Sequence, residues 1–231
     1  MTSHQQKQIE VINKIEERIR NNSLTSSVVE PVNDYENDNR LCLTSVHIPN
    51  QKLKTKILET IIKPLQKISP GHFYYSADSL HMTIKNIRVI NNPPNFTEED
   101  IQKVKEVFTK IIPKYKKFNV YFYRLLVFPL NLVLMGTTDP ELDNIFLDLD
   151  AELIKAGLPD DKKYSNNKYF FSNMTLARFK NSLTSEFKNK IEELSNSVSI
   201  APYTVDSVTL VSCNAALKKR RIIGEWELKH G

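Results

Sequence analysis

Polar and apolar residues alternate along the segment Asp-Ser-Leu-His-Met-Thr-Ile-Lys-Asn, which ends at Asn86. Alternate residues of a strand share one face, so the pattern predicts a strand with His81, Thr83 and Lys85 on one face and apolar residues directed into a core. An imidazole can transfer a proton near neutral pH, a hydroxyl can hydrogen-bond a phosphate oxygen, and an ammonium can offset its charge. This face suits phosphate chemistry; the alternative is a structural histidine in an ordinary strand.

A second segment, residues 170–178, repeats the order Xaa-Met-Thr-aliphatic about 90 positions later, a spacing near the size of a small α/β lobe. By the same alternation, Asn173, Thr175 and Ala177 share a face. Asn173 stands where the first segment has His81. The two copies therefore differ at the residue that would move a proton.

Apolar residues at helical spacing predict several helices. Pro64 is expected to kink the second helix or tighten its last turn. Asp139 is the expected N-cap of the fourth helix, with Pro140 as its first residue and a stop at Gly157. The helices are expected at residues 5–21, 51–68, 98–112, 140–156 and 184–195.

The remaining patterned segments predict strands, two of which form a hairpin around Pro129. Strands mixed with helices and hairpins indicate an α+β fold rather than a doubly wound parallel sheet. The strands are expected at residues 41–48, 73–90, 118–128, 132–136, 169–179, 204–213 and 221–228.

The N-terminal region differs in character from the rest of the chain. Its amphipathic helix is followed by polar residues 22–39, which predict a linker. We therefore expect an N-terminal segment, residues 1–39, and one main domain, residues 40–231. The helix either packs on the main domain or mediates association.

Composition narrows the class of protein without selecting a function. The 231 residues are 40% hydrophobic, enough for a sizeable core, and 32 basic against 27 acidic residues give a net charge of +5. That charge is compatible with a polyanionic ligand and equally with an ordinary soluble protein. Cys42 and Cys213 lie far apart without metal-type spacing, which favours a cytoplasmic protein with two thiols. The sequence shows neither a membrane-spanning run nor a secretory leader.

The two segments together resemble the 2H phosphoesterase superfamily, which includes 2′,5′ RNA ligase-like proteins and cyclic phosphodiesterases. The mark of that superfamily is a pair of His-x-Thr/Ser-x motifs, one in each lobe. His-Met-Thr-Ile beginning at His81 fits the first motif, and Asn-Met-Thr-Leu-Ala-Arg beginning at Asn173 fits the second except for its first residue. The similarity covers about residues 38–230.

The resemblance implies a bilobal, pseudo-symmetric fold with two mixed or antiparallel sheets, helices outside and a central cleft. It further implies that His81 transfers a proton while Thr83 and Thr175 hold a phosphate. No metal or other cofactor is required by this chemistry. The histidines lack carboxylate or cysteine partners at ligand spacing; they are His4, His47, His72, His81 and His230.

Asn173 divides the functional hypotheses. An amide can donate a hydrogen bond to phosphate but cannot titrate, and the loss of one acid–base partner typically costs ~10²–10⁴ in rate. One hypothesis is a weakened phosphodiesterase that acts on 2′,3′-cyclic phosphate or 2′,5′-linked RNA or nucleotide ends. The other is an impaired enzyme that binds RNA or nucleotide phosphate. If another residue supplies the second proton, His47 and His72 are the nearest candidates in sequence.

Further residues are candidates for binding phosphate or a base. Lys85 shares the predicted face of His81, whereas Arg178 reaches the cleft only if its strand bulges or ends there. Strand alternation places three aromatic residues on the same faces as the polar motif residues, where they can stack a base or pack in the core. They are Tyr75, Tyr169 and Phe171.

Two expectations concern the surroundings of the protein. A basic cluster at residues 218–221 either contacts a phosphate backbone or forms a solvated turn. The expected partner is an RNA or nucleotide, with no membrane, and the expected state is a monomer.

Overall fold

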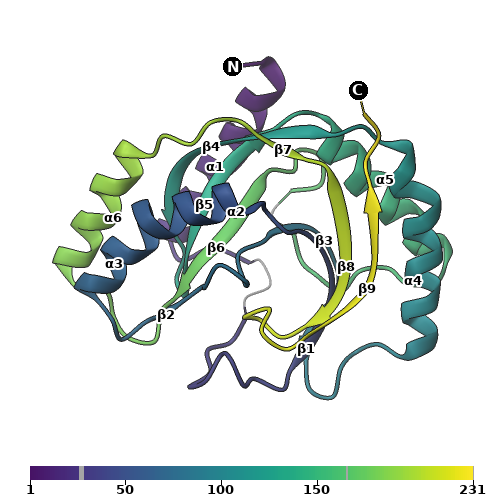
Figure 1. Ribbon diagram of the computed structural model, residues 1–231, viewed down its shortest axis with the longest axis horizontal. Coiled ribbons are helices and arrows are strands. Elements are labelled where there is room, and N and C mark those ends of the chain that lie inside the picture. The colour runs from purple at the N-terminus through teal and green to yellow at the C-terminus, as the bar shows by residue number, and fades with distance from the viewer. Residues whose placement is uncertain (26–28, 165, 231) are drawn as a thin grey trace.

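Two antiparallel sheets face each other in the computed structural model, which describes residues 1–25, 29–164 and 166–230 (Figure 1). Sheet A has the strand order β3-β1-β8-β9 and sheet B the order β2-β6-β5-β4-β7. The strands are β1 (Leu41–His47), β2 (Phe73–Tyr74), β3 (Met82–Asn91), β4 (Phe118–Val127), β5 (Asn131–Thr138), β6 (Ser172–Arg178), β7 (Tyr203–Val205), β8 (Ser207–Cys213) and β9 (Arg220–Glu227). The expected α+β class with two antiparallel sheets is confirmed.

Helices cover the outer faces of the two sheets. In Figure 1, α2, α3 and α6 lie on one flank beside sheet B, and α4 and α5 lie on the other flank beside sheet A. The helices are α1 (Ser3–Arg20), α2 (Gln51–Ile57), α3 (Lys63–Ile68), α4 (Glu98–Ile111), α5 (Glu141–Lys155) and α6 (Ser185–Ser197). The α1 helix packs on the other face of sheet B, the face that carries Val133 and Thr175.

Local sequence signals explain most helix ends. Thr97 and Asp100 form a reciprocal capping box at the start of α4, and the Thr184 side chain accepts from the Phe187 N–H at the start of α6. Gly157 ends α5 with φ of 77°, a backbone conformation that L side chains rarely adopt. Most boundaries predicted from these signals agree with the structure.

Two details of the helix predictions need refinement. Asp139 is not the N-cap of α5, because Pro140 occupies that position and the Asp139 carboxylate instead accepts from the Asn119 N–H at 2.8 Å. Pro64 lies just after a π-helical turn, Leu58–Ile62, that joins α2 to α3. Since proline lacks an N–H, this wider turn lets the helix pass the missing hydrogen bond without ending.

The predicted strand over residues 73–90 is two strands in different sheets. β2 pairs with β6 in sheet B, with Tyr74 opposite Ala177, whereas β3 pairs with β1 in sheet A. His81 lies just before β3, in the connection between the sheets. The chain therefore crosses from one lobe to the other immediately before the first motif.

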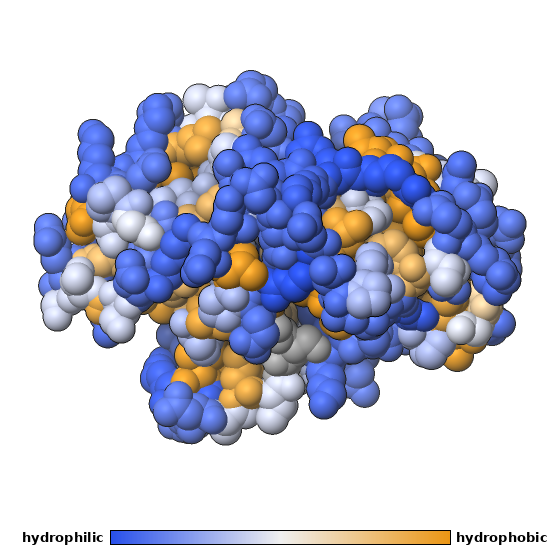
Figure 2. All heavy atoms as spheres, turned by 90° about the horizontal axis from the view of Figure 1, so that it is seen from below, coloured by the Kyte–Doolittle hydropathy of each residue, from blue (hydrophilic) through white to orange (hydrophobic). Residues whose placement is uncertain are grey.

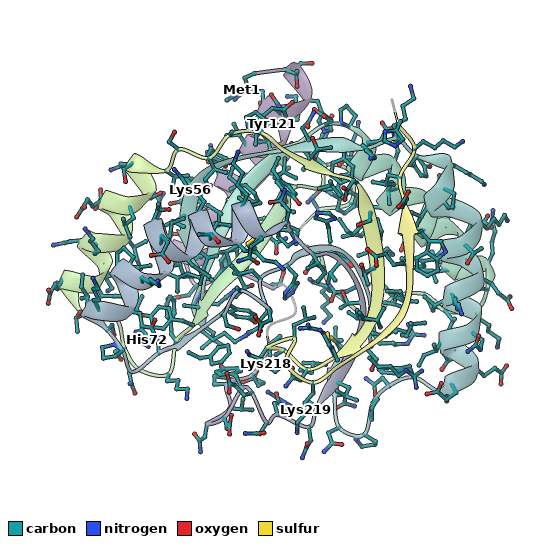
Figure 3. All side chains as sticks on the ribbon, in the orientation of Figure 1. Met1, Lys56, His72, Tyr121, Lys218 and Lys219 are labelled. Carbon is teal, nitrogen blue, oxygen red and sulfur yellow. The ribbon has the colours of Figure 1, made fainter. Side chains whose placement is uncertain are left out.

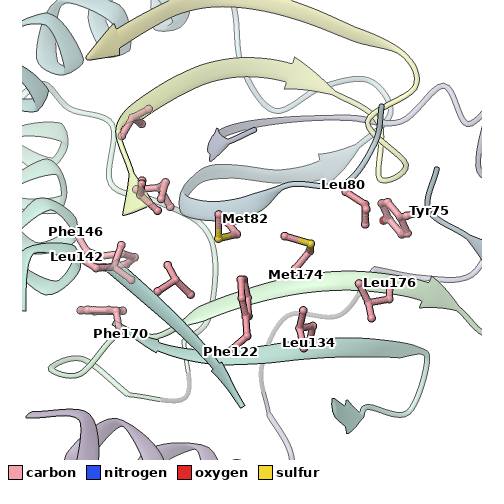
Figure 4. Close-up of a cluster of buried hydrophobic side chains, with 14 of the residues drawn as sticks. Tyr75, Leu80, Met82, Phe122, Leu134, Leu142, Phe146, Phe170, Met174 and Leu176 are labelled. Atoms are coloured by element: carbon pink, nitrogen blue, oxygen red, sulfur yellow. The ribbon is translucent and has the colours of Figure 1, made fainter. Parts of the chain in front are cut away.

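The sheets are not an N-terminal and a C-terminal half. Sheet A combines strands from both ends of the chain, and sheet B is built mainly from its middle. Met82 of β3 and Met174 of β6, which are 1% and 0% exposed, point toward each other in the apolar interior (Figure 4). The two motif strands are thus held to one continuous core, and their polar residues are directed away from it.

The N-terminal helix packs on sheet B. Ile12 contacts an apolar cluster that contains Val133 and Met135 of β5. The buried Gln8 side chain donates to Thr138 Oγ1 and accepts from the Thr138 N–H, each at 2.8 Å. Of the two roles considered for this helix, packing on the main domain is the one observed.

The segment after α1 also lies against the main domain where it is described. Asn214 Nδ2 donates to three carbonyl oxygens between Tyr35 and Asp38 at 3.1–3.3 Å. Lys219 Nζ donates to the Asn37 carbonyl at 2.7 Å, and Figure 3 shows Lys219 beside this segment. The main chain of this segment is therefore hydrogen-bonded to side chains of the turn between β8 and β9.

Candidate active-site cleft

Residues from both motif segments line one cavity of about 430 Å³. His81 approaches it from the connection before β3, Thr83 approaches it from β3 of sheet A, and Asn173 and Thr175 approach it from β6 of sheet B. All four side chains are half-buried, whereas Met82 and Met174 between them are buried. The alternation in each segment thus directs the polar residues to the same cavity.

A β-bulge in β6 brings Arg178 to this cavity. Val133 of β5 pairs with Thr175, while the preceding residue of β5 pairs with Ala177. Leu176 is therefore an extra residue in β6, and it shifts the alternation of faces by one position. Arg178 consequently shares the face of Thr175 and lines the cavity. The sequence allowed Arg178 to reach the cleft only if its strand bulged or ended there, and the strand bulges.

A bulge at the equivalent place in β3 has the opposite effect on Lys85. Val46 pairs with Thr83 and Ser45 pairs with Lys85, so Ile84 is the extra residue. Side chains of directly paired residues lie on the same face, so Thr83 and Lys85 face opposite sides of the sheet. The expectation that Lys85 shares the face of His81 assumed a regular strand and does not hold.

Lys85 instead forms a buried ion-pair cluster under α5. Its side chain is 0% exposed, and its Nζ lies 2.9 Å from Asp150 Oδ1 and contacts the Asp160 carboxylate. The ammonium also lies 4.1 Å from the centroid of the Phe146 ring. Although Lys85 lies beside the cavity, its charge is already neutralised by these two carboxylates.

His81 has the geometry of a proton acceptor. Its Nδ1 lies 2.7 Å from the Ser79 carbonyl oxygen, and a carbonyl only accepts, so the neutral ring carries its proton on Nδ1 and its lone pair on Nε2. Burial lowers the pKa of His81, and the positive charges of Arg178 and Arg220 lower it further. His81 is therefore neutral at pH 7 and able to accept a proton.

Arg178 is held from several directions. Its Nε donates to the Tyr75 hydroxyl at 2.9 Å, and that hydroxyl donates to the Ala215 carbonyl at 2.5 Å. The guanidinium carbon lies 5.5 Å from the Tyr35 ring centroid and 5.9 Å from the Tyr75 ring centroid. Tyr75 is only 1% exposed, so its position suits support of Arg178 better than stacking of a base.

The other aromatic candidates occupy different surroundings. Phe171 lines the cavity and packs against the apolar cluster around Ile12. Tyr169 packs against His4 of α1, with ring centroids 5.9 Å apart, and is not among the described residues that line the cavity.

His47 and His72 serve the core rather than the cleft. His47 Nδ1 lies 2.8 Å from the Ser207 carbonyl and its Nε2 lies 3.0 Å from the Tyr203 hydroxyl, which satisfies both ring nitrogens. His72 packs against Phe179 and Phe187. Burial lowers the pKa of both imidazoles. Neither is among the described residues that line the cavity.

Several cavity residues were not singled out from the sequence. Asn86 follows Thr83 by the same interval at which Arg178 follows Thr175, so an alignment of the two segments pairs Asn86 with Arg178. That alignment is the available signal for Asn86, whereas four other polar residues come from the start of β5 and from distant loops. They are Asn131, Lys162, Asn166 and Asn214.

The basic cluster at residues 218–221 is mostly engaged in contacts within the protein. Lys218 Nζ lies 2.8 Å from Ser76 Oγ, and Arg220 donates to the Asp78 carbonyl at 2.8 Å. Arg221 forms a bidentate pair with Glu98. The contacts of Lys218 and Arg220 connect the turn between β8 and β9 to the loop that precedes His81, and that of Arg221 connects it to the start of α4.

The surface seen in Figure 2 is mainly hydrophilic, with apolar atoms in small groups. No helix of the described residues combines the length and apolar character needed to cross a bilayer. In the described part of the chain, no three His, Cys, Asp or Glu side chains are grouped to hold a metal ion.

Comparisons in sequence and in three dimensions give different results. No protein-family model matches the sequence, and no curated protein matches it. Solved structures do match: Escherichia coli LigT in its apo form has a TM-score of 0.54 at 16% identity, over 84% of this chain and 100% of LigT. TT0787 of Thermus thermophilus has a TM-score of 0.53 at 13% identity, over 83% of this chain and 98% of TT0787.

A third match is ATU0111 of Agrobacterium tumefaciens str. C58, described as a conserved protein of unknown function. Its TM-score is 0.57 at 13% identity, over 80% of this chain and 86% of ATU0111. At sequence identities of 13–16%, these matches support a shared fold but not a shared activity. The chain therefore shares its two-sheet fold with Escherichia coli LigT and these other solved structures.

Proposed function

We propose that this protein is a metal-independent phosphodiesterase of the 2H type, which acts on 2′,3′-cyclic phosphate or 2′,5′-linked RNA or nucleotide ends. The observation that carries the proposal is the convergence of His81, Thr83 and Thr175 on one cavity beside Arg178. A proton acceptor, two hydroxyls and a fixed cation are groups that can promote phosphodiester hydrolysis.

Each residue has a role that follows from its chemistry. The His81 Nε2 lone pair accepts a proton from the attacking water. The Thr83 and Thr175 hydroxyls donate to non-bridging phosphate oxygens, and the Arg178 guanidinium offsets the charge that develops there.

Asn173 limits the rate of this reaction. It occupies the position from which a second acid–base group would protonate the leaving oxygen, and its amide donates a hydrogen bond without releasing the proton. Water must then protonate the leaving group, at a cost of ~10²–10⁴ in rate. We accordingly propose a slow enzyme rather than an efficient one.

Ligands of structural neighbours agree with a nucleotide substrate. LigT structures have been solved with ATP, with 3′-AMP and with phosphate. A cavity of about 430 Å³ lies in the usual range for small-molecule sites, so a nucleotide is a suitable occupant of the cleft.

Asn173 specifically favours one alternative, a nucleotide- or RNA-binding protein without turnover. A turnover assay and a binding titration on one preparation, both with adenosine 2′,3′-cyclic monophosphate, separate the two functions. Hydrolysis that disappears in His81→Ala supports the enzyme. Saturable binding with no hydrolysis above the buffer rate supports the binding protein, and the absence of both contradicts the site.

The two threonines provide a test of the phosphate position. Thr83→Ala and Thr175→Ala should each weaken binding of the cyclic nucleotide by about 0.5–3 kcal/mol, because each removes a hydrogen bond to a charged group. Isothermal titration at two salt concentrations measures this, and wild-type affinity should fall as salt rises. Thr60→Ala, on the exposed side of the helix beside sheet B, is the matched control and should bind as wild type does. Unchanged affinity in both cleft variants would remove phosphate from this position.

A further inference from the structure

Two thiols lie side by side in the wall of the cleft. Cys42 of β1 pairs directly with Cys213 of β8, and their sulfur atoms are 3.7 Å apart without a disulfide. Both residues line the same cavity as His81 and Thr83. The sequence places them 171 positions apart, so only the sheet brings them together.

The backbone at this pair is already suited to a disulfide. Directly paired residues of antiparallel strands have Cα atoms about 4.5 or 5.5 Å apart, and both spacings lie in the range that disulfides span. The sulfur atoms need to approach each other by less than about 2 Å to bond. Rotation of the two side chains can supply that movement without a change of strand register.

The two thiols also differ in a way that favours a defined reaction order. Cys42 is half-buried at the cavity wall, whereas Cys213 is 2% exposed. The hydrogen bond with Cys213 lowers the pKa of the Cys42 thiol, and the nearby Lys162 charge lowers it further. The hydrogen bond with Cys42, together with burial, raises the pKa of the Cys213 thiol. Cys42 is thus the nucleophile and Cys213 the resolving thiol.

We propose that Cys42 and Cys213 form a reversible cross-strand disulfide when the protein meets hydrogen peroxide. The Cys42 thiolate attacks one peroxide oxygen, the O–O bond breaks, and protonation releases water and leaves a sulfenic acid. The Cys213 sulfur then displaces hydroxide from that sulfenic acid, its proton completes a second water molecule, and the S–S bond forms. The two thiols together supply the two electrons that reduce one peroxide, and a dithiol reductant reverses the change.

Mass spectrometry of the full-length protein tests this site. Treatment of reduced protein with hydrogen peroxide should remove two hydrogen atoms from the intact mass, and a non-reducing digest should join the peptides that contain Cys42 and Cys213. The melting temperature should rise by several degrees, because the bond closes a long loop in the unfolded chain. Dithiothreitol should restore both the mass and the melting temperature.

Two variants provide controls. In Cys213→Ala, Cys42 should stop at the sulfenic acid and react with dimedone, whereas oxidised wild-type protein should not. Cys42→Ser should resist mild peroxide at Cys213. Stable sulfinic acid at Cys42 in wild-type protein, or a disulfide between two protein molecules, overturns the proposal.

A second, independent observation concerns Tyr35. It is 1% exposed and belongs to the segment between α1 and β1, which the Asn214 side chain holds by its carbonyl groups. Its ring lies against the Arg178 guanidinium, on which Tyr75 also packs. Among the described residues, no group hydrogen-bonds the buried Tyr35 hydroxyl. The ring, rather than the hydroxyl, is therefore the part of Tyr35 that contacts the candidate site.

The geometry points to Tyr35 as a positioning residue that holds Arg178 toward the cleft, an inference that rests on the proposed phosphate site. A guanidinium between two aromatic rings and a hydrogen-bond acceptor has few alternative positions. The N-terminal segment would thereby be part of the ligand site, although its residues precede both motif segments.

The hydroxyl and the ring can be tested separately. Tyr35→Phe should bind adenosine 2′,3′-cyclic monophosphate within about twofold of wild type, whereas Tyr35→Leu should bind at least about fivefold more weakly, because it removes a cation–π contact. In an Arg178→Lys background, Tyr35→Leu should have little further effect, since residues that act through one another are not additive. This double-mutant comparison separates positioning of Arg178 from a general loss of stability.

The outcomes distinguish this inference from the proposed function. If Thr83→Ala weakens binding and Tyr35→Leu does not, the phosphate site stands and the role of Tyr35 is overturned. An equal loss in Tyr35→Phe and Tyr35→Leu also overturns it, because the hydroxyl would then be the active group. If none of these variants affects binding, the proposed function fails together with this inference.

Discussion

Asn173→His should raise hydrolysis of a 2′,3′-cyclic nucleotide by ~10²-fold or more. The substitution places a second imidazole in the cavity that already holds His81, Thr83 and Thr175. Asn173 is half-buried and borders this space, so the larger ring has room on the cavity side. Initial rates at saturating substrate, compared with wild type on the same day, measure the gain.

The pH profile should change shape together with the rate. Burial holds the pKa of His81 below its usual 6.5, and its neutral form is the active base. Activity of the wild-type protein should therefore fall as pH decreases through that lowered pKa and stay level above it. In Asn173→His, a second limb should appear, because the introduced imidazole must be protonated to act as the acid and loses its proton as pH rises. The result is a bell-shaped profile.

A control variant identifies the origin of the gain. His81→Ala in the Asn173→His background should abolish the increase, because the two imidazoles act as one unit. A folded Asn173→His protein that binds ligand normally but gains no activity would show that the cleft is not built for this chemistry. If the wild-type protein is already fast and Asn173→His slows it, another residue supplies the second proton.

Lys85→Met should lower the free energy of unfolding by about 3 kcal/mol, because it leaves buried carboxylate charge without its partner. The Lys85 ammonium is fully buried between Asp150 and Asp160, and the Asp160 side chain is only 8% exposed. Methionine keeps most of the apolar stem, so the loss reports the charge more than the volume. Urea denaturation at pH 7, with wild-type slope as the reference, measures the difference.

Two controls accompany this measurement. Lys63→Met removes a lysine whose side chain is 56% exposed and paired with Glu59 four positions earlier, and it should cost less than about 1 kcal/mol. Adding Asp160→Asn to Lys85→Met should recover part of the lost stability, because it removes an unpaired buried charge. If Lys85→Met costs no more than Lys63→Met, and ligand affinity falls instead, Lys85 acts in the cleft after all.

The two motif segments show where sequence patterns are sufficient. Alternation along each segment correctly placed His81 and Thr83, and Asn173 and Thr175, on polar faces, because strand geometry fixes neighbouring side chains on opposite sides. Met82 and Met174 turn inward for the same reason. The repeat by itself only permitted these faces to meet at one cleft, and the resemblance to the 2H phosphoesterases was what implied it.

The residues after each threonine show where alternation fails. Lys85 and Arg178 exchanged their expected positions relative to the cleft because both motif strands contain a bulge, at Ile84 and Leu176. A bulge depends on pairing with the neighbouring strand, and its extra residue leaves no clear mark in the local sequence. The alternation of side chains between the two faces therefore predicted their directions only as far as the bulge in each strand.

The sequence by itself determined the classes of the elements, most helix caps, the α+β fold and the residues that carry the proposed chemistry, because these depend on periodicity and on nearby side chains. Only the tertiary structure decided the direction of Lys85, the support of Arg178 by Tyr35 and Tyr75, and the contact of Cys42 with Cys213. Each of these joins segments distant in the chain, and such contacts are set by strand order and register. Those are long-range properties that no local pattern encodes.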